Sequence, residues 1–292
     1  MQRLSQALLA LGLLVLASAP ATAMPGKIQV VTSPGGVTAW LAEETAVPII
    51  SVRFAFAGGG ALDPVGKEGL ANMVSGLLDE GASELDALAF QTRKDELAMR
   101  LSFDASRDDF FGSFATLKRN RDASFELLRL ALTAPRFDEK PVERIRRQII
   151  VGLTRDLEQP RTIAGRDWFK AVFGDHPYWH ATDGTLDGAK AIAPDDLKSF
   201  VRRRFAKDNL KIAVVGDIDA ETLGRLLDHT FGALPATSAA GSVPTAAFAS
   251  PGGLKVIHRP IPQSTIYFGL PGIKRDDPDW YVAHLMNYVL GG

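Results

Sequence analysis

Apolar residues recur along the chain with two different periods. Alternation of large apolar residues with others, as in 51–56, predicts a strand that buries one face. Alternating or continuous apolar runs of this kind predict strands over 27–32, 37–42, 49–57, 97–104, 108–115 and 210–216. Helical spacing predicts helices over 120–132, 140–157, 162–173, 194–204 and 219–231. Because the two kinds of element do not alternate regularly, the pattern favours an α+β fold, in which helices cover a mixed, largely antiparallel sheet.

A further helix is predicted within GKEGLANMVSGLLDEGA, residues 66–82. Its apolar stripe consists of Leu70, Met73, Val74, Leu77 and Leu78. Gly81 stands where a left-handed C-terminal cap is expected. The other face carries Asn72, Ser75 and Gly76, which are small and chemically quiet. The segment therefore predicts a normally packed helix with an uncharged outer face.

The first 23 residues differ from the rest of the chain. They combine one positive charge at Arg3, an apolar run over 7–17 and the triplet Ala21-Thr22-Ala23. This is the pattern of a secretory signal peptide, with cleavage after Ala23. The apolar run is too short for a bilayer, which takes about 20 residues. We expect export, to the periplasm in a Gram-negative bacterium, and no membrane insertion once the signal is removed.

Composition divides the remaining chain into a large unit over 24–233, a linker over 234–252 and a short last segment over 253–292. The linker, LPATSAAGSVPTAAFASPG, is uncharged and rich in Ala, Ser, Pro and Gly. The last segment predicts a hairpin (254–258 and 264–270) and a helix (278–290). About 40 residues are too few for an independent core, so this unit looks truncated.

Charge and composition exclude some classes of function. The formal net charge is -1, and the chain contains no Cys. The basic stretches 144–147 and 202–204 have no interleaved aromatic residues and are typical of solvated helix faces, so we expect no nucleic-acid partner. Because an exported protein without cysteine has no disulfides, we expect its fold to depend on a hydrophobic core.

Several short motifs, in this order and spacing, resemble the insulinase-like family, which includes pitrilysin and the mitochondrial processing peptidases. The matching segments are 48–82, 174–178, 184–185, 195–197, 213–218 and 287–292. The last of them is similar to the start of a glycine-rich segment in the family's second homologous domain. The resemblance therefore implies that 253–292 begins such a domain.

Active members of this family carry the inverted zinc motif H-x-x-E-H, in which two His bind zinc and the Glu activates a water. The resemblance places Asn72 and Gly76 at the two His positions and Ser75 at the Glu position. It places the later Glu ligand at Gly152. An amide, a hydroxyl and hydrogen atoms supply neither zinc ligands nor a general base. We expect no catalytic residue, no metal and no cofactor in this chain, and no peptidase activity from it alone.

Three other sets of residues are weaker candidates for chemistry. His176 and His180 have a ligand spacing, but Pro177 lies between them in a segment that predicts a loop. Asp79-Glu80 is more typical of a solvated helix end than of an acid pair. The glycines at 58–60 match no phosphate-binding pattern and predict a turn.

Family members without the zinc motif are typically partners of a zinc-bearing subunit. The resemblance therefore implies a non-catalytic subunit of a heterodimeric zinc peptidase, with the zinc held by the partner. Peptide substrates would then bind by pairing with a sheet edge, for which 49–56 is the candidate strand. Two alternatives stay open. The chain is a stand-alone peptide-binding or assembly protein, or it is a metallopeptidase with displaced ligands.

Overall fold

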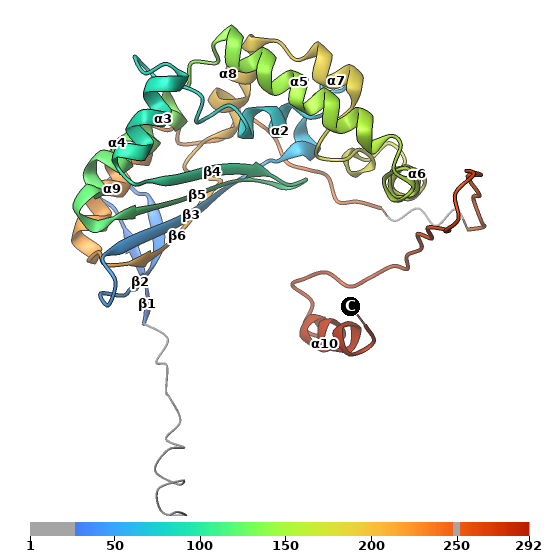
Figure 1. Cartoon of the computed structure of the whole chain (residues 1–292). Helices are drawn as coiled ribbons and strands as arrows, with labels where there is room; N and C mark the ends of the chain where they lie inside the picture. The colour runs from blue at the N-terminus through green and yellow to red at the C-terminus, as the bar shows by residue number, and fades with distance from the viewer. Residues whose placement is uncertain (1–26, 248–251, 292) are drawn as a thin grey trace, which may run out of the picture.

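The computed structural model describes residues 27–247 and 252–291, which Figure 1 draws in colour. The predicted signal peptide, 1–23, lies outside the described residues. The first part of the predicted linker is hydrogen-bonded to the large unit, since the amide nitrogen of Ala239 donates to the Arg203 carbonyl oxygen at 2.9 Å. The division of the chain into domains stays a prediction.

One six-stranded sheet, in the order β1-β2-β6-β3-β5-β4, forms the framework of the large unit. Its strands are β1 (Ile28–Thr32), β2 (Thr38–Glu43), β3 (Ile49–Ala57), β4 (Arg100–Ala105), β5 (Asp109–Leu117) and β6 (Leu210–Gly216). Neighbouring strands are antiparallel except β2 and β6, which run parallel. The prediction of a mixed, largely antiparallel sheet in an α+β fold is confirmed.

Helices α2 to α9 lie on one side of this sheet, with α6 beyond the ends of the strands (Figure 1). They are α2 (Leu70–Ser75), α3 (Ala87–Glu96), α4 (Arg121–Thr133), α5 (Glu139–Asp156), α6 (Pro160–Phe173), α7 (Leu186–Ala191), α8 (Pro194–Arg204) and α9 (Ala220–Phe231). Three short 3-10 helices accompany them: η1 (Gly60–Leu62), η2 (Lys118–Asn120) and η3 (Pro177–Trp179). Alternate strand residues point into this layer, and fully buried phenylalanines such as Phe56, Phe110 and Phe114 form its centre.

None of the helices within 27–247 covers the opposite face of the sheet (Figure 1). Trp40, Phe111 and Val215 expose 47%, 40% and 51% of their surface there, on strands β2, β5 and β6. Their strand neighbours Leu41, Phe110 and Val214 are buried on the helical side. The strict alternation in these strands thus separates a packed face from an open one.

Helix α2 is shorter than predicted. It ends at Ser75, and turns follow where the pattern predicts helix as far as Gly81. The Ser75 hydroxyl donates to the Asn72 carbonyl oxygen at 2.8 Å, and Gly76 follows as the C-terminal cap. A hydroxyl that competes for backbone groups and a glycine of low helix propensity both favour termination here. Gly81 does take a left-handed conformation, with φ of 116°.

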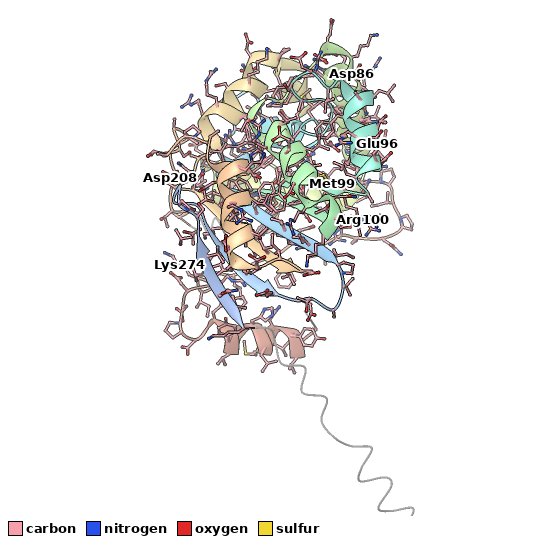
Figure 2. All side chains as sticks on the ribbon, turned by 90° about the vertical axis from the view of Figure 1, so that its left-hand side faces the viewer. Asp86, Glu96, Met99, Arg100, Asp208 and Lys274 are labelled. Carbon is pink, nitrogen blue, oxygen red and sulfur yellow. The ribbon has the colours of Figure 1, made fainter. Side chains whose placement is uncertain are left out.

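Two helices are absent from the sequence predictions. Helix α3 buries one side chain, Phe90, and therefore shows no apolar stripe. Figure 2 shows this helix between Asp86 and Glu96, with Met99 and Arg100 leading into β4. Helix α7 has six residues, too few for a period to be recognised.

The predicted hairpin at 254–258 and 264–270 is wrong. Within 252–291 the structure contains one regular element, α10 (Trp280–Val289), which agrees with the predicted helix. Apolar side chains such as Ile266, Phe268 and Leu270 are about four-fifths exposed, at 79%, 85% and 84%. A two-stranded hairpin without a packing partner is marginally stable, so alternation alone does not form one.

Candidate functional site

The N-terminus of α2 is anchored by a buried carboxylate. Asp63 accepts hydrogen bonds from the amide nitrogens of Gly69 at 3.1 Å and Ala71 at 3.2 Å. Gly69 is the N-cap residue and has φ of 100°, a conformation that favours glycine. These contacts satisfy amide groups that the first turn of a helix leaves without partners. The Asp63 side chain therefore fixes where the helix starts.

Arg204 of α8 holds Asp63 in place. The guanidinium lies 3.1 Å from the Asp63 carboxylate, and the two side chains are 6% and 0% exposed. It also donates to the carbonyl oxygens of Gly58, Gly59 and Leu62 at 3.2, 2.8 and 2.6 Å. Burial raises the pKa of Asp63, whereas the Arg204 charge and the amides of α2 oppose that rise. No sequence signal indicated this pair, because its members lie on separate elements far apart in the chain.

The glycines at 58–60 form the turn that the sequence predicts. A Cβ atom on Gly59 would lie 2.2 Å from the carbonyl oxygen of Ser106, in the turn between β4 and β5. The amide nitrogen of Gly60 donates to that same oxygen at 2.8 Å. The run permits close backbone approach beneath α2, which is a structural use of glycine rather than phosphate binding.

The three positions that the resemblance aligns with the H-x-x-E-H motif lie together on α2 and its cap. Asn72 and Gly76 are half-buried, and Ser75 is 9% exposed. The Ser75 hydroxyl is already used in its hydrogen bond to the Asn72 carbonyl. Its proton points at a carbonyl oxygen, which does not activate it as a nucleophile. A hydroxyl is also too weak a base to take a proton from water.

Helix α5 packs against α2 at Gly76. A Cβ atom on Gly76 would lie 3.3 Å from Cγ2 of Ile145. Ile145, Ile149 and Gly152 follow at i, i+4 and i+7 and so share one face of α5. A Cβ atom on Gly152 would meet nothing within 4 Å, so this position faces open space. The assignment of Gly152 to the later ligand position stays a prediction.

The chemistry available at these four positions is one amide, one hydroxyl and two hydrogen atoms. Over 27–247 and 252–291, no three His, Cys, Asp or Glu residues cluster in a way that could hold a metal ion. The donors of this face do not fit zinc, which takes imidazole, thiolate or carboxylate ligands. What remains is a face that can contact a ligand through its backbone and its small side chains.

The strand beside this helix is an edge strand. β4 packs against α2 and, among the described strands, pairs only with β5, so the backbone groups on its other side have no strand partner there. The candidate edge at 49–56 is wrong, because β3 pairs with β5 over its whole length and with β6 over most of it. β6, from much later in the chain, occupies the position next to β3 that the sequence pattern leaves open.

The weaker candidates contain no site. His180 is 7% exposed and its Nδ1 lies 3.1 Å from the Ala181 carbonyl oxygen, whereas Nε2 of His176 lies 2.9 Å from the carbonyl oxygen of Pro244. The two rings therefore have separate backbone partners. Asp79 and Glu80 are not a solvated helix end, since they form ion pairs with Lys94 at 3.1 Å and Arg144 at 2.5 Å.

Comparison with known proteins gives a consistent picture. Residues 191–292 match the family described as Peptidase M16 inactive domain. The chain is 27% identical over 251 residues to the non-peptidase homolog YmxG of Helicobacter pylori, a match that covers 86% of this chain and 58% of the relative. It is 20% identical over 240 residues to the mitochondrial-processing peptidase subunit beta of Saccharomyces cerevisiae, covering 80% of this chain and 51% of that protein.

Among solved structures, the crystal structure of a peptidase M16 inactive domain from Pseudomonas fluorescens superposes with a TM-score of 0.71. The sequences are 25% identical, and the match covers 75% of this chain and 54% of that one. The chain thus spans between half and three-fifths of the length of these relatives. No helix in the described part of the chain is both long and apolar enough to cross a membrane.

Proposed function

We propose that this chain, a member of the insulinase-like family that lacks the H-x-x-E-H zinc motif, is the non-catalytic subunit of an exported heterodimeric zinc metallopeptidase. In this role it forms part of the peptide-binding chamber, and a partner subunit supplies the zinc, its ligands and the general base. The chain itself contains no H-x-x-E-H sequence. Export rests on the predicted signal peptide and is part of the proposal.

The observation that carries the proposal is the retention of the α2 scaffold without its chemistry. Asp63 and Arg204 anchor α2, which packs against α5 and the edge strand β4. Asn72, Gly76 and Gly152 nevertheless offer no zinc ligand and no base. A non-catalytic subunit that lines a peptide-binding chamber needs this helix in position to contact the peptide, but does not need its catalytic residues.

Peptide binding is proposed at β4 rather than at 49–56. An edge strand offers a ladder of main-chain donors and acceptors to any extended peptide, whatever its side chains. Since β4 lies next to α2, a peptide paired with it would pass close to the degenerate site. The yeast relative is named as one subunit of a processing peptidase, which is compatible with a two-subunit arrangement.

The test is reconstitution of activity. The full chain is mixed with an exported H-x-x-E-H relative from the same organism, and hydrolysis of a fluorogenic peptide is measured. We expect no hydrolysis by the chain alone, hydrolysis by the mixture, and its loss on addition of a chelator. Chelator-sensitive hydrolysis by the chain alone would instead support a metallopeptidase with displaced ligands.

A stand-alone peptide-binding or assembly protein is the second candidate, and the Helicobacter relative, described as a non-peptidase homolog, is the observation that favours it. Affinity capture of the tagged chain from its native extract distinguishes the two. Recovery of a zinc-peptidase relative in equal amount supports the heterodimer. Recovery of the chain without such a relative, together with binding of peptides, supports the second candidate.

A further inference from the structure

A pocket lies near the C-terminal end of β4. The pocket has a volume of about 250 Å³, and its walls come from the β4–β5 turn, helix α6, the η3 region and the segment after 252. Three arginines line it: Arg107, Arg161 and Arg166. Its size lies below the range of about 300–1,000 Å³ typical of sites for whole small molecules. It suits one side chain of a larger ligand.

Arg107 is the central cation of this pocket. Its guanidinium carbon lies 4.2 Å from the centre of the Phe169 ring, which holds it in place by cation–π contact. Its Nε atom is buried and has no hydrogen-bond partner among the described residues. Burial lowers the pKa of Arg107, opposed by the charges of Asp108 and Asp183. A buried donor without a partner is costly, and a bound acceptor would relieve that cost.

The lining of the pocket carries more cations than anions. It contains three guanidinium groups and two carboxylates, Asp156 and Asp183, and a third carboxylate, Asp108, lies next to Arg107 outside the lining. Within the described residues, neither Arg107 nor the two arginines of α6 forms an ion pair with these carboxylates. Arginine presents a planar fork that matches a carboxylate in two parallel hydrogen bonds.

The pocket lies where a peptide paired with β4 would arrive. β4 ends at Ala105, and Arg107 follows two residues later in the turn. A strand advances by about 3.3 Å per residue, so one to three residues beyond the paired stretch would reach the pocket.

We propose that the pocket formed by Arg107, Arg161 and Arg166 binds a carboxylate of the peptide that pairs with β4, and so selects acidic peptides. The proposal rests on the peptide-binding role described above. Phe169 and Trp179 contribute aromatic surface to the walls of the pocket.

The experiment compares matched peptides on the full chain by isothermal titration calorimetry. Each peptide has one β-forming core of about six residues, the length of β4. One pair carries Glu or Gln before the core, a second pair carries Glu or Gln after it, and a third pair has a free or amidated C-terminus. The pairs distinguish side-chain from terminal carboxylates, and an antiparallel from a parallel peptide.

We expect at least one acidic or free-carboxylate member to bind about tenfold more tightly than its neutral match. The variant Arg107→Met should abolish this preference, while Arg202→Met, at an exposed position on α8, should keep it. Arg161→Met changes an exposed side chain, so it should reduce the preference without affecting the fold. If Arg107→Met does not fold, Arg161→Met still tests the pocket.

Three outcomes decide between the ideas. Discrimination that is lost in Arg107→Met, or weakened in Arg161→Met, supports the pocket. Equal binding of all matched pairs overturns the acidic specificity and leaves the peptide-binding role standing. Failure of every peptide to bind overturns both.

Discussion

Replacing Arg204 by methionine tests the anchoring of α2. Methionine keeps most of the side-chain volume but removes the charge and all donors. In the native protein the guanidinium donates to three carbonyl oxygens and pairs with Asp63, and its side chain is 6% exposed. The substitution would leave the Asp63 carboxylate, which is 0% exposed, without its counter-ion.

The expected loss follows from these contacts. Breaking a buried ion pair by removing one partner costs about 3–5 kcal/mol, because an uncompensated charge stays buried. Two amides, from Gly69 and Ala71, still bind the carboxylate, so Asp63 is not left entirely unsatisfied. The three carbonyl oxygens that lose their guanidinium donor make the loss of stability larger. We therefore expect the free energy of unfolding to fall by about 3–5 kcal/mol.

Urea denaturation followed by far-UV circular dichroism measures this loss as a shift of the midpoint at constant slope. Arg202→Met, two positions earlier on an exposed turn of α8, is the matched control and should change stability by less than about 0.5 kcal/mol. The double variant Arg204→Met/Asp63→Asn buries no unpaired charge and should lose less than the sum of the single losses, by about 0.5–3 kcal/mol. A loss below about 1 kcal/mol in Arg204→Met would refute the reasoning.

Three further predictions concern the site, the edge and an ionisable phenol. A variant with the ligands of the H-x-x-E-H motif at the four aligned positions should bind one zinc by metal analysis, measured beside the native chain, for which we expect none. Its substitutions are Asn72→His, Ser75→Glu, Gly76→His and Gly152→Glu. A failure of this variant to bind zinc would show that the four positions do not converge. Ser102→Pro and Phe103→Pro each remove one backbone amide of β4, and one of these amides points away from β5. The variant that removes this outward amide should lose peptide binding and should lose less thermal stability than the other. Equal effects of the two substitutions would argue against edge pairing. Burial and the hydrogen bond to Asp108 raise the pKa of Tyr178 to about 12, so the stability it contributes is complete below about pH 10 and is lost as the pH rises through about 12. Absorbance at high pH should show one late tyrosine titration that Tyr178→Phe removes, and its absence from the native chain would contradict the burial.

The elements that the sequence predicts well are those that bury one face. Strands β3 and β6 and helix α8 match their predicted bounds, because alternation and helical period report burial directly. Strand order has no such local signal. The insertion of β6 beside β3, parallel to β2, is a long-range choice that made the predicted edge wrong. The predicted hairpin fails for the related reason that alternation needs a packed partner surface.

The candidate site divides in the same way. The spacing of Asn72, Ser75 and Gly76 is local and therefore readable, since a helix brings such positions to one side. The pair of Asp63 and Arg204, and the cation pocket around Arg107, join elements distant in sequence. A lone arginine in a turn does not differ in sequence from a solvated one. Only the packing of the folded chain distinguishes a buried guanidinium group from a solvated one.

The contacts that anchor α2 are largely separate from the positions that the resemblance aligns with the zinc motif. Its anchoring contacts are made by Asp63 at the N-terminal end and by the buried stripe that includes Met73 and Val74. Among the positions aligned with the zinc motif, Asn72 is half-buried and Gly152 of α5 faces open space, whereas Ser75 is buried and Gly76 packs against Ile145. Substitution at an open position such as Gly152 should cost little stability, whereas substitution at the anchor should cost much more. The structure therefore combines a buried anchor with a neighbouring face that offers no zinc ligand and no general base.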